Sequence, residues 1–424
     1  MQGFIWLLLG AHVTSSARAL LITQFAWKYL DYNWDSQQRK NYFVQNGLYD
    51  YRNLTPIDVD QSADGRTFIT VIRGPGVPAS VHTVSNRVDR ASGPLLEPYP
   101  NWSWYRDEIG CEGIINVYRV AIDKCQRLWV LDTGLRSGSH ICPAKLLAFN
   151  LRDNKLIYKT AIPDNVAQNR QGQGQLVTPI VQCEPSRCQD VKVYMADVAG
   201  SSVVVFDSDR LGAHRIDDDF RGVYTAEPAH VNTTIAGESF TLADGVLGMA
   251  LSPRQSNGDR YLAFRPFASL SVYFANTREL LRPPPANSLG NDRRYNNVHY
   301  LRAIDVLPSQ ATAMAFSSGN VLFYGLTKEI GIGCYNFHKT IGGRRDRYLF
   351  RVPVQDYGRL QFVSGMKIIQ NPSIPGGEEI ITMSNRLQKI YAGTQNFNEV
   401  NFQVSRISVK HAIQGTMCDS NNNV

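Results

Sequence analysis

The stretch that decides the fold is VAIDKCQRLWVLDTG, residues 120–134, together with KLLAFNL at residues 145–151. An apolar run is followed by a short polar turn, and then by an aromatic-rich run that ends at Asp132 and bends at Gly134. Short runs rich in β-branched and aromatic residues, separated by turn residues, are typical of antiparallel strands. The stretch therefore predicts consecutive strands of one small sheet.

The same order of strand, turn and aromatic strand recurs along the chain. No helical period competes with it over comparable lengths, and the units begin roughly every 50–70 residues, which is within reach of propeller blades with variable loops. The units lie at residues 57–86, 120–151, 191–207 with a preceding strand near 176–182, 248–277, 312–337 and 365–391. The sequence therefore predicts an all-β protein with six blades.

The two ends of the chain supply further strand-like segments, FAWKYLDYNW at 25–34 and VNFQVSRISV at 400–409. A blade shared between the termini closes the ring without leaving open sheet edges. We therefore predict a single six-bladed β-propeller over residues 20–424, closed by pairing of the N- and C-terminal strands. One short helix is predicted at 36–46, with Asp35 as its N-cap.

The Asp-Thr-Gly at residues 132–134 matches the motif that carries the catalytic carboxylate of aspartic proteases. Those enzymes need two carboxylates that share one proton, whereas this chain has one Asp-Thr-Gly and no Asp-Ser-Gly. We interpret Asp132 as the end of a blade strand and Gly134 as a turn residue. The sequence also lacks the Gly-x-Ser-x-Gly of serine hydrolases and paired histidines of metal enzymes. No catalytic residue, metal or cofactor is predicted.

The stretch DVDQSADG at 58–65 resembles the start of a calcium-binding loop. The twelfth position of that loop would be Val71 instead of a glutamate, so we expect a hairpin turn at Asp64-Gly65. Some six-bladed hydrolases hold calcium in the central channel. Three residues are candidates for such a site here, although they do not make a full ligand set: Asp58, Asp123 and Asn385.

Residues 1–19 carry an apolar run that ends in Ala17-Arg18-Ala19, which is typical of a secretory signal peptide cleaved after Ala19. The run is too short to span a bilayer, so we expect a secreted protein with no membrane segment. In an oxidising compartment, seven cysteines predict disulfides and one thiol left over. Three sequons predict N-glycosylation at Asn53, Asn101 and Asn232.

The formal net charge of +7 arises from 44 Lys and Arg against 37 Asp and Glu. The densest basic clusters are GGRRDR at 342–347 and the arginine pair at 293–294. We interpret both as solvated loops and predict no specific nucleic-acid partner. The sequence leaves the oligomeric state open.

Several long motifs carry a resemblance to a known family: DYNWDSQQRK (31–40), GVPASVHTVS (76–85), LLEPYPNWS (95–103), VAIDKCQRLWVLDTG (120–134), GMALSP (248–253), IGCYNF (332–337), MSNRLQKIY (383–391) and FNEVNFQV (397–404). They occur in the order found in the insect yellow and major royal jelly protein family. The chain resembles that family over essentially its whole mature length, and is most similar to the royal jelly and royal-jelly-like branch. The resemblance implies a secreted six-bladed propeller.

The resemblance also implies disulfide partners. It pairs Cys334 with Cys418, and Cys111 with Cys142 as an additional link of the nearer branch. It pairs Cys125 with a cysteine before the next blade, which is either Cys183 or Cys188 here. The spacing slightly favours Cys188, and the other residue would be the free thiol.

The family includes nutritive proteins, proposed dopachrome-converting enzymes and salivary proteins that capture biogenic amines. The resemblance places a ligand at one mouth of the channel, near Met366, Asn385 and Leu387. Asn385 keeps the matching amide, whereas Leu387 replaces an aromatic residue and Met366 a hydroxyl, which removes ring stacking and a hydrogen bond.

We therefore expect a non-catalytic binding or nutritive storage protein, with an apolar or aromatic ligand such as a sterol, an amine or a catechol. The alternative is a tautomerase that acts on dopachrome in melanin formation.

Overall fold

The computed structural model describes residues 21–210, 212–217, 222–282, 300–304, 307–338, 350–371, 373–374 and 377–419. The predicted signal peptide and both basic clusters, at 293–294 and 342–347, lie outside the described residues. Within the described part, no helix is both long and apolar enough to cross a bilayer.

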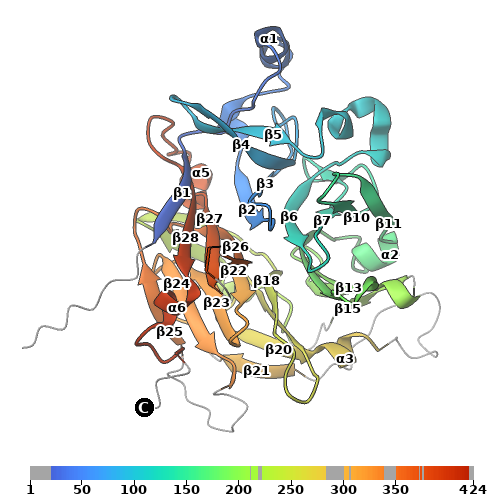
Figure 1. Ribbon diagram of the computed structural model, residues 1–424, viewed down its shortest axis with the longest axis vertical. Helices are drawn as coiled ribbons and strands as arrows, with labels where there is room; N and C mark the ends of the chain where they lie inside the picture. Colours follow the sequence, from blue (N-terminus) through green and yellow to red (C-terminus); the bar gives the residue numbers. More distant parts are fainter. Residues whose placement is uncertain are drawn as a thin grey trace, which may run out of the picture.

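Six four-stranded antiparallel sheets surround a central channel, so the predicted six-bladed β-propeller is confirmed (Figure 1). Blades one to three are β2 (Pro56–Gln61), β3 (Thr67–Val71), β4 (Val81–Asp89) and β5 (Gly93–Pro98); β6 (Val117–Ile122), β7 (Arg127–Asp132), β10 (Lys145–Asn150) and β11 (Leu156–Ala161); β12 (Leu176–Glu184), β13 (Arg187–Asp197), β14 (Ser202–Asp207) and β15 (Gly212–Ile216).

Blades four to six are β18 (Val246–Leu251), β19 (Tyr261–Pro266), β20 (Val272–Asn276) and β21 (Tyr300–Ile304); β22 (Ala311–Phe316), β23 (Val321–Leu326), β24 (Gly331–Asn336) and β25 (Phe350–Gln355); β26 (Val363–Gln370), β27 (Glu378–Ser384), β28 (Phe402–Ser408) and β1 (Ile22–Trp27). The first strand of each of the first five blades, and β26 of the sixth, lines the channel. These six are called the inner strands.

The ring closes through the two ends of the chain, as the sequence predicts. β1 pairs antiparallel with β28, and the register sets Ile22 opposite Arg406 and Trp27 opposite Phe402. The outermost strand of the sixth blade therefore comes from the N-terminus, while its other three strands come from the C-terminus. The pairing covers the edge of β28, which would otherwise offer free backbone groups to another chain.

The aromatic-rich run RLWVLD at residues 127–132 forms β7, and the burial of this strand explains its composition. Trp129 is 1% exposed and the neighbouring Leu128, Val130 and Leu131 are fully buried. Because both faces of β7 are buried between neighbouring blades, its sequence is a continuous apolar run and does not alternate between apolar and polar residues.

The Asp-Thr-Gly motif ends this strand and has a structural role. The buried Asp132 carboxylate accepts hydrogen bonds from the backbone N–H groups of Ile115 at 2.8 Å and Asn116 at 2.9 Å, and it lies 3.0 Å from Lys145 Nζ. Gly134 adopts a positive φ of 68°, and a Cβ there would lie 2.0 Å from the carbonyl oxygen of Cys142. The motif is therefore a strand end and a tight turn.

The predicted hairpin turn and the predicted short helix are both present. The hairpin turn at Asp64-Gly65 joins β2 to β3, with Gly65 at a φ of 88°. The helix α1 (Gln37–Gln45) is present, but Asp35 is not its N-cap. Ser36 accepts the hydrogen bond from Arg39 N at 3.1 Å, and Asp35 instead forms an ion pair with the Arg39 side chain at 2.6 Å.

Candidate functional site

All six inner strands begin at the same end of the channel. Polar contacts join the first three residues of five of these strands: Arg119 donates to Thr178 Oγ1 at 3.1 Å and to the Ser364 carbonyl at 2.9 Å, and Thr178 donates to the Leu247 carbonyl at 2.9 Å. Thr312 Oγ1 donates to the carbonyl of Val363. We call this end of the channel, with the segments that precede the inner strands, the start mouth.

The middle of the channel is too narrow for an organic ligand. Its cavity is about 30 Å³, which is room for one or two water molecules. Methionine side chains from three neighbouring inner strands line it: Met249, Met314 and Met366. A ligand of the size of a catechol would therefore have to bind at a mouth of the channel.

One wall of the channel is charged. Lys367 Nζ lies 2.8 Å and 2.6 Å from the two carboxylate oxygens of Asp58, which is fully buried. Asp58 also accepts a hydrogen bond from the backbone N–H of Val120 at 3.2 Å. The lysine thus supplies the positive charge that a metal ion would supply beside this carboxylate.

The three candidates for a channel metal are not brought together. Asp58 pairs with Lys367 in mid-channel, and Asn385 donates to the Pro56 carbonyl at 2.8 Å at the start mouth. Asp123 follows β6 at the opposite end and accepts hydrogen bonds from Arg127 and Trp129. The carboxylates already have cationic or N–H partners, so these residues do not form a common ligand set.

Aromatic side chains gather at the start mouth. The ring of Phe240 stacks on Tyr391 at 5.1 Å between centroids and lies 6.1 Å from Phe362, which is also 6.0 Å from Phe267. Phe240 belongs to β17 (Glu238–Thr241), and Tyr391 to the short helix α5 (Leu387–Ala392). Phe362 precedes β26 with a positive φ of 51°, a backbone conformation that a bulky residue rarely adopts.

A half-buried carboxyl group, that of Asp244, lies near one of these rings, Tyr391, and near the Tyr118 phenol. Burial raises the pKa of Asp244 to about 6, although the nearby Arg119 guanidinium opposes the rise. The charge of Asp244 in turn contributes to raising the pKa of Tyr118, to about 12, and that of Tyr391, in both cases after burial of the phenol. No side-chain hydrogen bond to Asp244 is formed by the described residues.

Buried amides complete the start mouth. Asn385 and Gln388 are both fully buried, and among the described residues neither Asn385 Oδ1 nor Gln388 Oε1 accepts a hydrogen bond. Their amide nitrogens are engaged, with Pro56 O and with Gln361 Oε1, each at 2.8 Å. Buried acceptors without donors are costly and call for a partner such as water or a ligand.

The structure separates the ligand-site residues expected from the sequence by depth. Asn385 lies at the start mouth, Leu387 is half-buried at the start of α5, and Met366 lines the mid-channel cavity below them. Sequence reasoning missed Tyr118, Asp244 and Tyr391. The first two lie at or just before the start of an inner strand, which is the one signal that could have found them.

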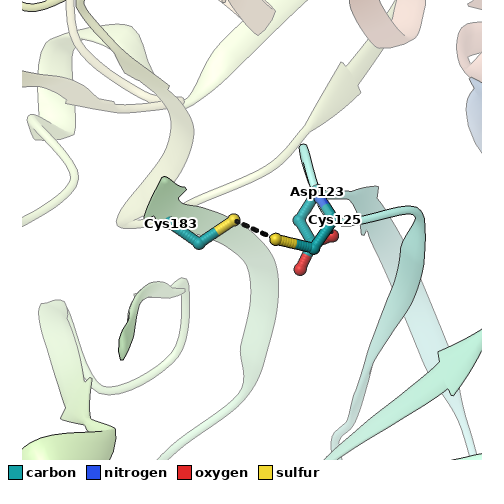
Figure 2. A group of neighbouring side chains, drawn as sticks. All are labelled: Asp123, Cys125 and Cys183. Carbon is teal, nitrogen blue, oxygen red and sulfur yellow. Dashed lines mark hydrogen bonds between the residues drawn. The ribbon is translucent and has the colours of Figure 1, made fainter. Parts of the chain in front are cut away.

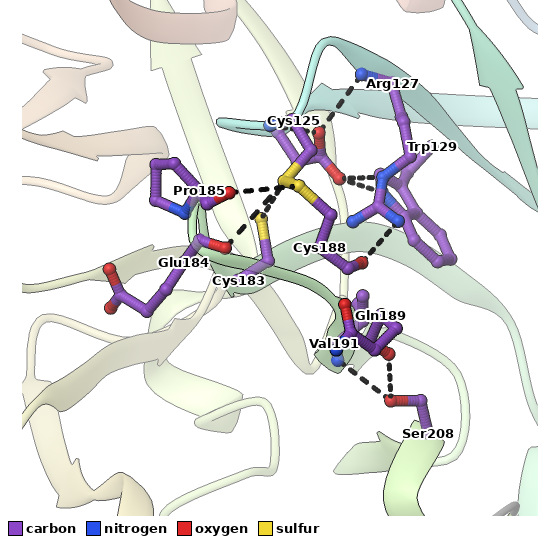
Figure 3. A network of polar contacts seen from close by, with 11 residues as sticks. Cys125, Arg127, Trp129, Cys183, Glu184, Pro185, Cys188, Gln189, Val191 and Ser208 are labelled. Atoms are coloured by element: carbon purple, nitrogen blue, oxygen red, sulfur yellow. Dashed lines mark hydrogen bonds and ion pairs between the residues drawn. A yellow bond between two sulfur atoms is a disulfide. The ribbon is translucent and has the colours of Figure 1, made fainter.

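Three disulfides staple the propeller. Cys111 pairs with Cys142, Cys334 with Cys418, and Cys125 with Cys188, while Cys183 is a buried free thiol. The Cys125–Cys188 bond joins the β6–β7 turn of blade two to the β12–β13 hairpin of blade three (Figure 3). The link at Cys334 ties β24 to the segment beyond α6 (Val409–Ile413).

The three sequon asparagines are exposed. Asn53 ends a short 3₁₀ turn, Asn101 accepts a hydrogen bond from Ser103 N at 2.9 Å, and Asn232 begins β16 (Asn232–Ile235). Glycosylation at these positions stays a prediction.

The fold and its site define a disulfide-stapled six-bladed propeller with a blocked channel and a polar, aromatic mouth. Residues 115–418 match the model of the family described as Major royal jelly protein. The chain belongs to this family, as the resemblance seen in the sequence motifs implies.

Individual relatives support the assignment. Major royal jelly protein 9 of Apis mellifera is 35% identical over 435 residues, covering 98% of this chain and 96% of the relative. Major royal jelly protein 6 of the same species is 36% identical over 413 residues, covering 94% and 87%. Among solved structures, an α-L-arabinofuranosidase of Fusarium graminearum is 8% identical with a TM-score of 0.42, covering 94% and 100%. That likeness is too distant to bear on activity.

Proposed function

We propose that this protein is a secreted, glycosylated, non-catalytic binding or storage protein that takes a small aromatic ligand at the start mouth. One observation supports the proposal: the start mouth brings together aromatic rings, a carboxylate with a raised pKa and buried amide oxygens that accept no hydrogen bond from the described residues. The exposed ring of Tyr391, backed by buried Phe240, offers an aromatic face. Asp244 offers a negative charge, and the oxygens of Asn385 and Gln388 offer acceptors. Such a set suits an aromatic molecule that carries N–H or O–H donors.

This chemistry ranks the three candidate ligand classes. A catechol amine satisfies the acceptors and pairs its ammonium with Asp244, whereas a catechol without the amine lacks the charge-assisted contact. A sterol offers a single hydroxyl and is too large for the narrow channel below the mouth. Dopamine should therefore bind more tightly than catechol, and catechol more tightly than cholesterol.

Calorimetric titration with dopamine, catechol and cholesterol tests the proposal. We expect saturable binding of dopamine, about tenfold tighter than catechol because a charge-assisted hydrogen bond adds more than 1 kcal/mol. Asp244→Asn should reduce the affinity for dopamine to that for catechol. Asp153→Asn, an exposed change in the β10–β11 turn, is the matched control. Failure of all three ligands to bind would leave a nutritive or structural role.

Secretion and glycosylation are part of the same proposal. Three disulfides and exposed sequon asparagines are consistent with passage through an oxidising compartment. Expression in insect cells, followed by N-glycosidase treatment of the culture medium, provides the test. We expect a secreted protein whose mass falls after treatment. Retention of all the protein inside the cells would contradict secretion.

The alternative function is a dopachrome tautomerase, and one observation favours it. A carboxyl group with a pKa near 6, held beside the Tyr118 phenol, is suited to accept a proton near neutral pH. The test is the loss of dopachrome colour with native protein, heat-denatured protein and Asp244→Asn. Equal rates in all three samples would exclude the enzyme.

A further inference from the structure

Three sulfur atoms meet where blades two and three touch. Cys125 and Cys188 are bonded, and the Sγ atom of buried Cys183 lies 4.0 Å from Cys125 Sγ. Figure 2 shows the side chains of Cys183 and Cys125 pointing toward one another, and Figure 3 shows the Cys125–Cys188 disulfide with Cys183 beside it. These three residues are called the sulfur cluster. A thiol in contact with a disulfide is arranged for exchange with it.

The backbone brings both possible partners of Cys125 to one hairpin. Cys183 lies near the end of β12 and Cys188 near the start of β13, and the turn between them is exposed at Pro185 and Ser186. The ladder shifts register between Gln182 and Glu184. Cys183 faces the interior, whereas Cys188 is partly exposed. Either cysteine can therefore hold Cys125 to the same hairpin.

A metal site does not explain this cluster. Among the described residues, Asp123, Cys125 and Cys183 form the one group whose ligand atoms all lie within 4.8 Å of each other. The Asp123 oxygens, however, accept from Cys125 N at 2.9 Å, Arg127 Nε at 2.6 Å and Trp129 Nε1 at 2.7 Å. Cys125 is in a disulfide and has no thiolate to offer. The Asp123 oxygens and Cys125 Sγ already form other bonds and are not free to bind a metal ion.

We propose that Cys183 exchanges with the Cys125–Cys188 disulfide and so makes Cys188 a covalent attachment site for small-molecule disulfides. The Cys183 thiol gives its proton to solvent, and its thiolate attacks Cys125 Sγ. A bond forms between Cys183 and Cys125, and the Cys125–Cys188 bond breaks. Cys188 leaves as a thiolate and takes up a proton from solvent, so the exchange needs no oxidant or reductant.

The exchange moves a thiol from the interior to the surface. Burial, with the neighbouring Asp123 carboxylate, raises the pKa of Cys183, so its thiolate is scarce and the attack is slow. The released thiolate is better hydrated because Cys188 is partly exposed. Both forms keep one covalent link between blades two and three, so the propeller does not depend on which pairing is present.

The free Cys188 can then react with a disulfide of a small thiol, such as cystine. Its thiolate attacks one sulfur of cystine, a mixed disulfide forms on Cys188, and one cysteine leaves as a thiolate. Cystine supplies the second sulfur, so the oxidation state balances. The exposed hairpin tip leaves room for an adduct that buried Cys183 could not accept.

The test is to label the folded protein with N-ethylmaleimide, without reductant, and then map the disulfides by tryptic digestion. Arg187 separates the two cysteines, because trypsin yields residues 171–187 with Cys183 and residues 188–192 with Cys188. We expect the label on 188–192, and residues 125–127 linked to 171–187. Incubation with cystine in place of maleimide should add one cysteinyl group to 188–192.

Variants distinguish exchange from simple exposure. Cys183→Ser keeps the Cys125–Cys188 pair and should lose the label at residue 188, while Cys188→Ser should form the Cys125–Cys183 bond and remain unlabelled. Circular dichroism and melting curves check that both fold. The proposal is overturned by label on Cys183 in the folded wild type, by label on Cys188 in Cys183→Ser, or by labelling of neither cysteine unless the protein is denatured.

Discussion

The two ends of the inner strands hold carboxyl groups in opposite states. At the start mouth, Asp244 is half-buried with a raised pKa and accepts no side-chain hydrogen bond from the described residues. At the other end, Asp123 is buried and accepts from two side chains and from the backbone N–H groups of Cys125 and Arg127. Asp123 is therefore committed to holding a turn, whereas Asp244 is the carboxylate that the proposed function assigns to a ligand.

The largest expected effect comes from removing the committed carboxylate. Asp123→Asn should lower the free energy of unfolding by about 3 kcal/mol, because it breaks the ion pair with Arg127 and leaves buried donors unpaired. Urea unfolding followed by circular dichroism measures this loss. Asp153→Asn is the control and should change stability little. If Asp123→Asn changes the free energy of unfolding as little as Asp153→Asn does, Asp123 is not committed to holding the turn, and the two ends of the channel do not differ in this way.

The matching change at the start mouth should have the opposite sign. A folded pKa of about 6 lies above the unfolded value, so the charged form of Asp244 costs stability above that pH and its protonation removes the cost. At pH 7.5, Asp244→Asn should therefore raise the free energy of unfolding, by up to about 2 kcal/mol for a partly exposed group. The gain over wild type should vanish as the pH falls to 4.

Urea unfolding of wild type and Asp244→Asn at several pH values provides this measurement. The two proteins share every other titrating group, so their difference isolates Asp244. A loss of stability in Asp244→Asn at pH 7.5 would show that this carboxylate is committed too, and would remove the contrast with Asp123.

The sequence predicts the blades well and the mouth poorly, for physical reasons. Strand runs and turns are local, and the terminal segments at 25–34 and 400–409 leave few ways to close a ring, so β1 pairs with β28 as expected. Tyr118, Asp244 and Tyr391 belong to different blades and meet only when the ring closes. Their spacing along the sequence therefore does not predict that they lie close together.

The cysteines show the same limit in another form. Cys183 and Cys188 lie on one hairpin, so the spacing along the chain favours Cys188 only slightly over Cys183 as the partner of Cys125. The structure pairs Cys188 and buries Cys183. In the proposed exchange, the folded protein uses both cysteines in turn as the partner of Cys125.

A smaller effect concerns the pH dependence of ligand binding. An ammonium ligand pairs with Asp244 only when the carboxyl group is ionised, so the affinity for dopamine should fall as the pH drops through about 6. From pH 7.5 to 5 we expect a loss of about tenfold, the value of one charge-assisted hydrogen bond. Calorimetric titration at both pH values measures it. Catechol, which has no ammonium, should bind equally at both, and a similar loss for catechol would assign the effect to another group.

The smallest effect should come from restoring a ring to the start mouth. Leu387 is half-buried beside the aromatic group that contains Tyr391, at a position where the resemblance to the amine-binding branch implies an aromatic side chain. Leu387→Phe should tighten dopamine binding by about three- to tenfold, because an added ring contact is worth about 0.5–1.5 kcal/mol. Leu156→Phe, on an exposed edge strand of blade two, is the matched control. Leu387→Phe could leave the affinity unchanged while Asp244→Asn lowers it. In that case the ligand contacts the carboxylate without contacting the aromatic rings of the start mouth, and those rings have a structural role only.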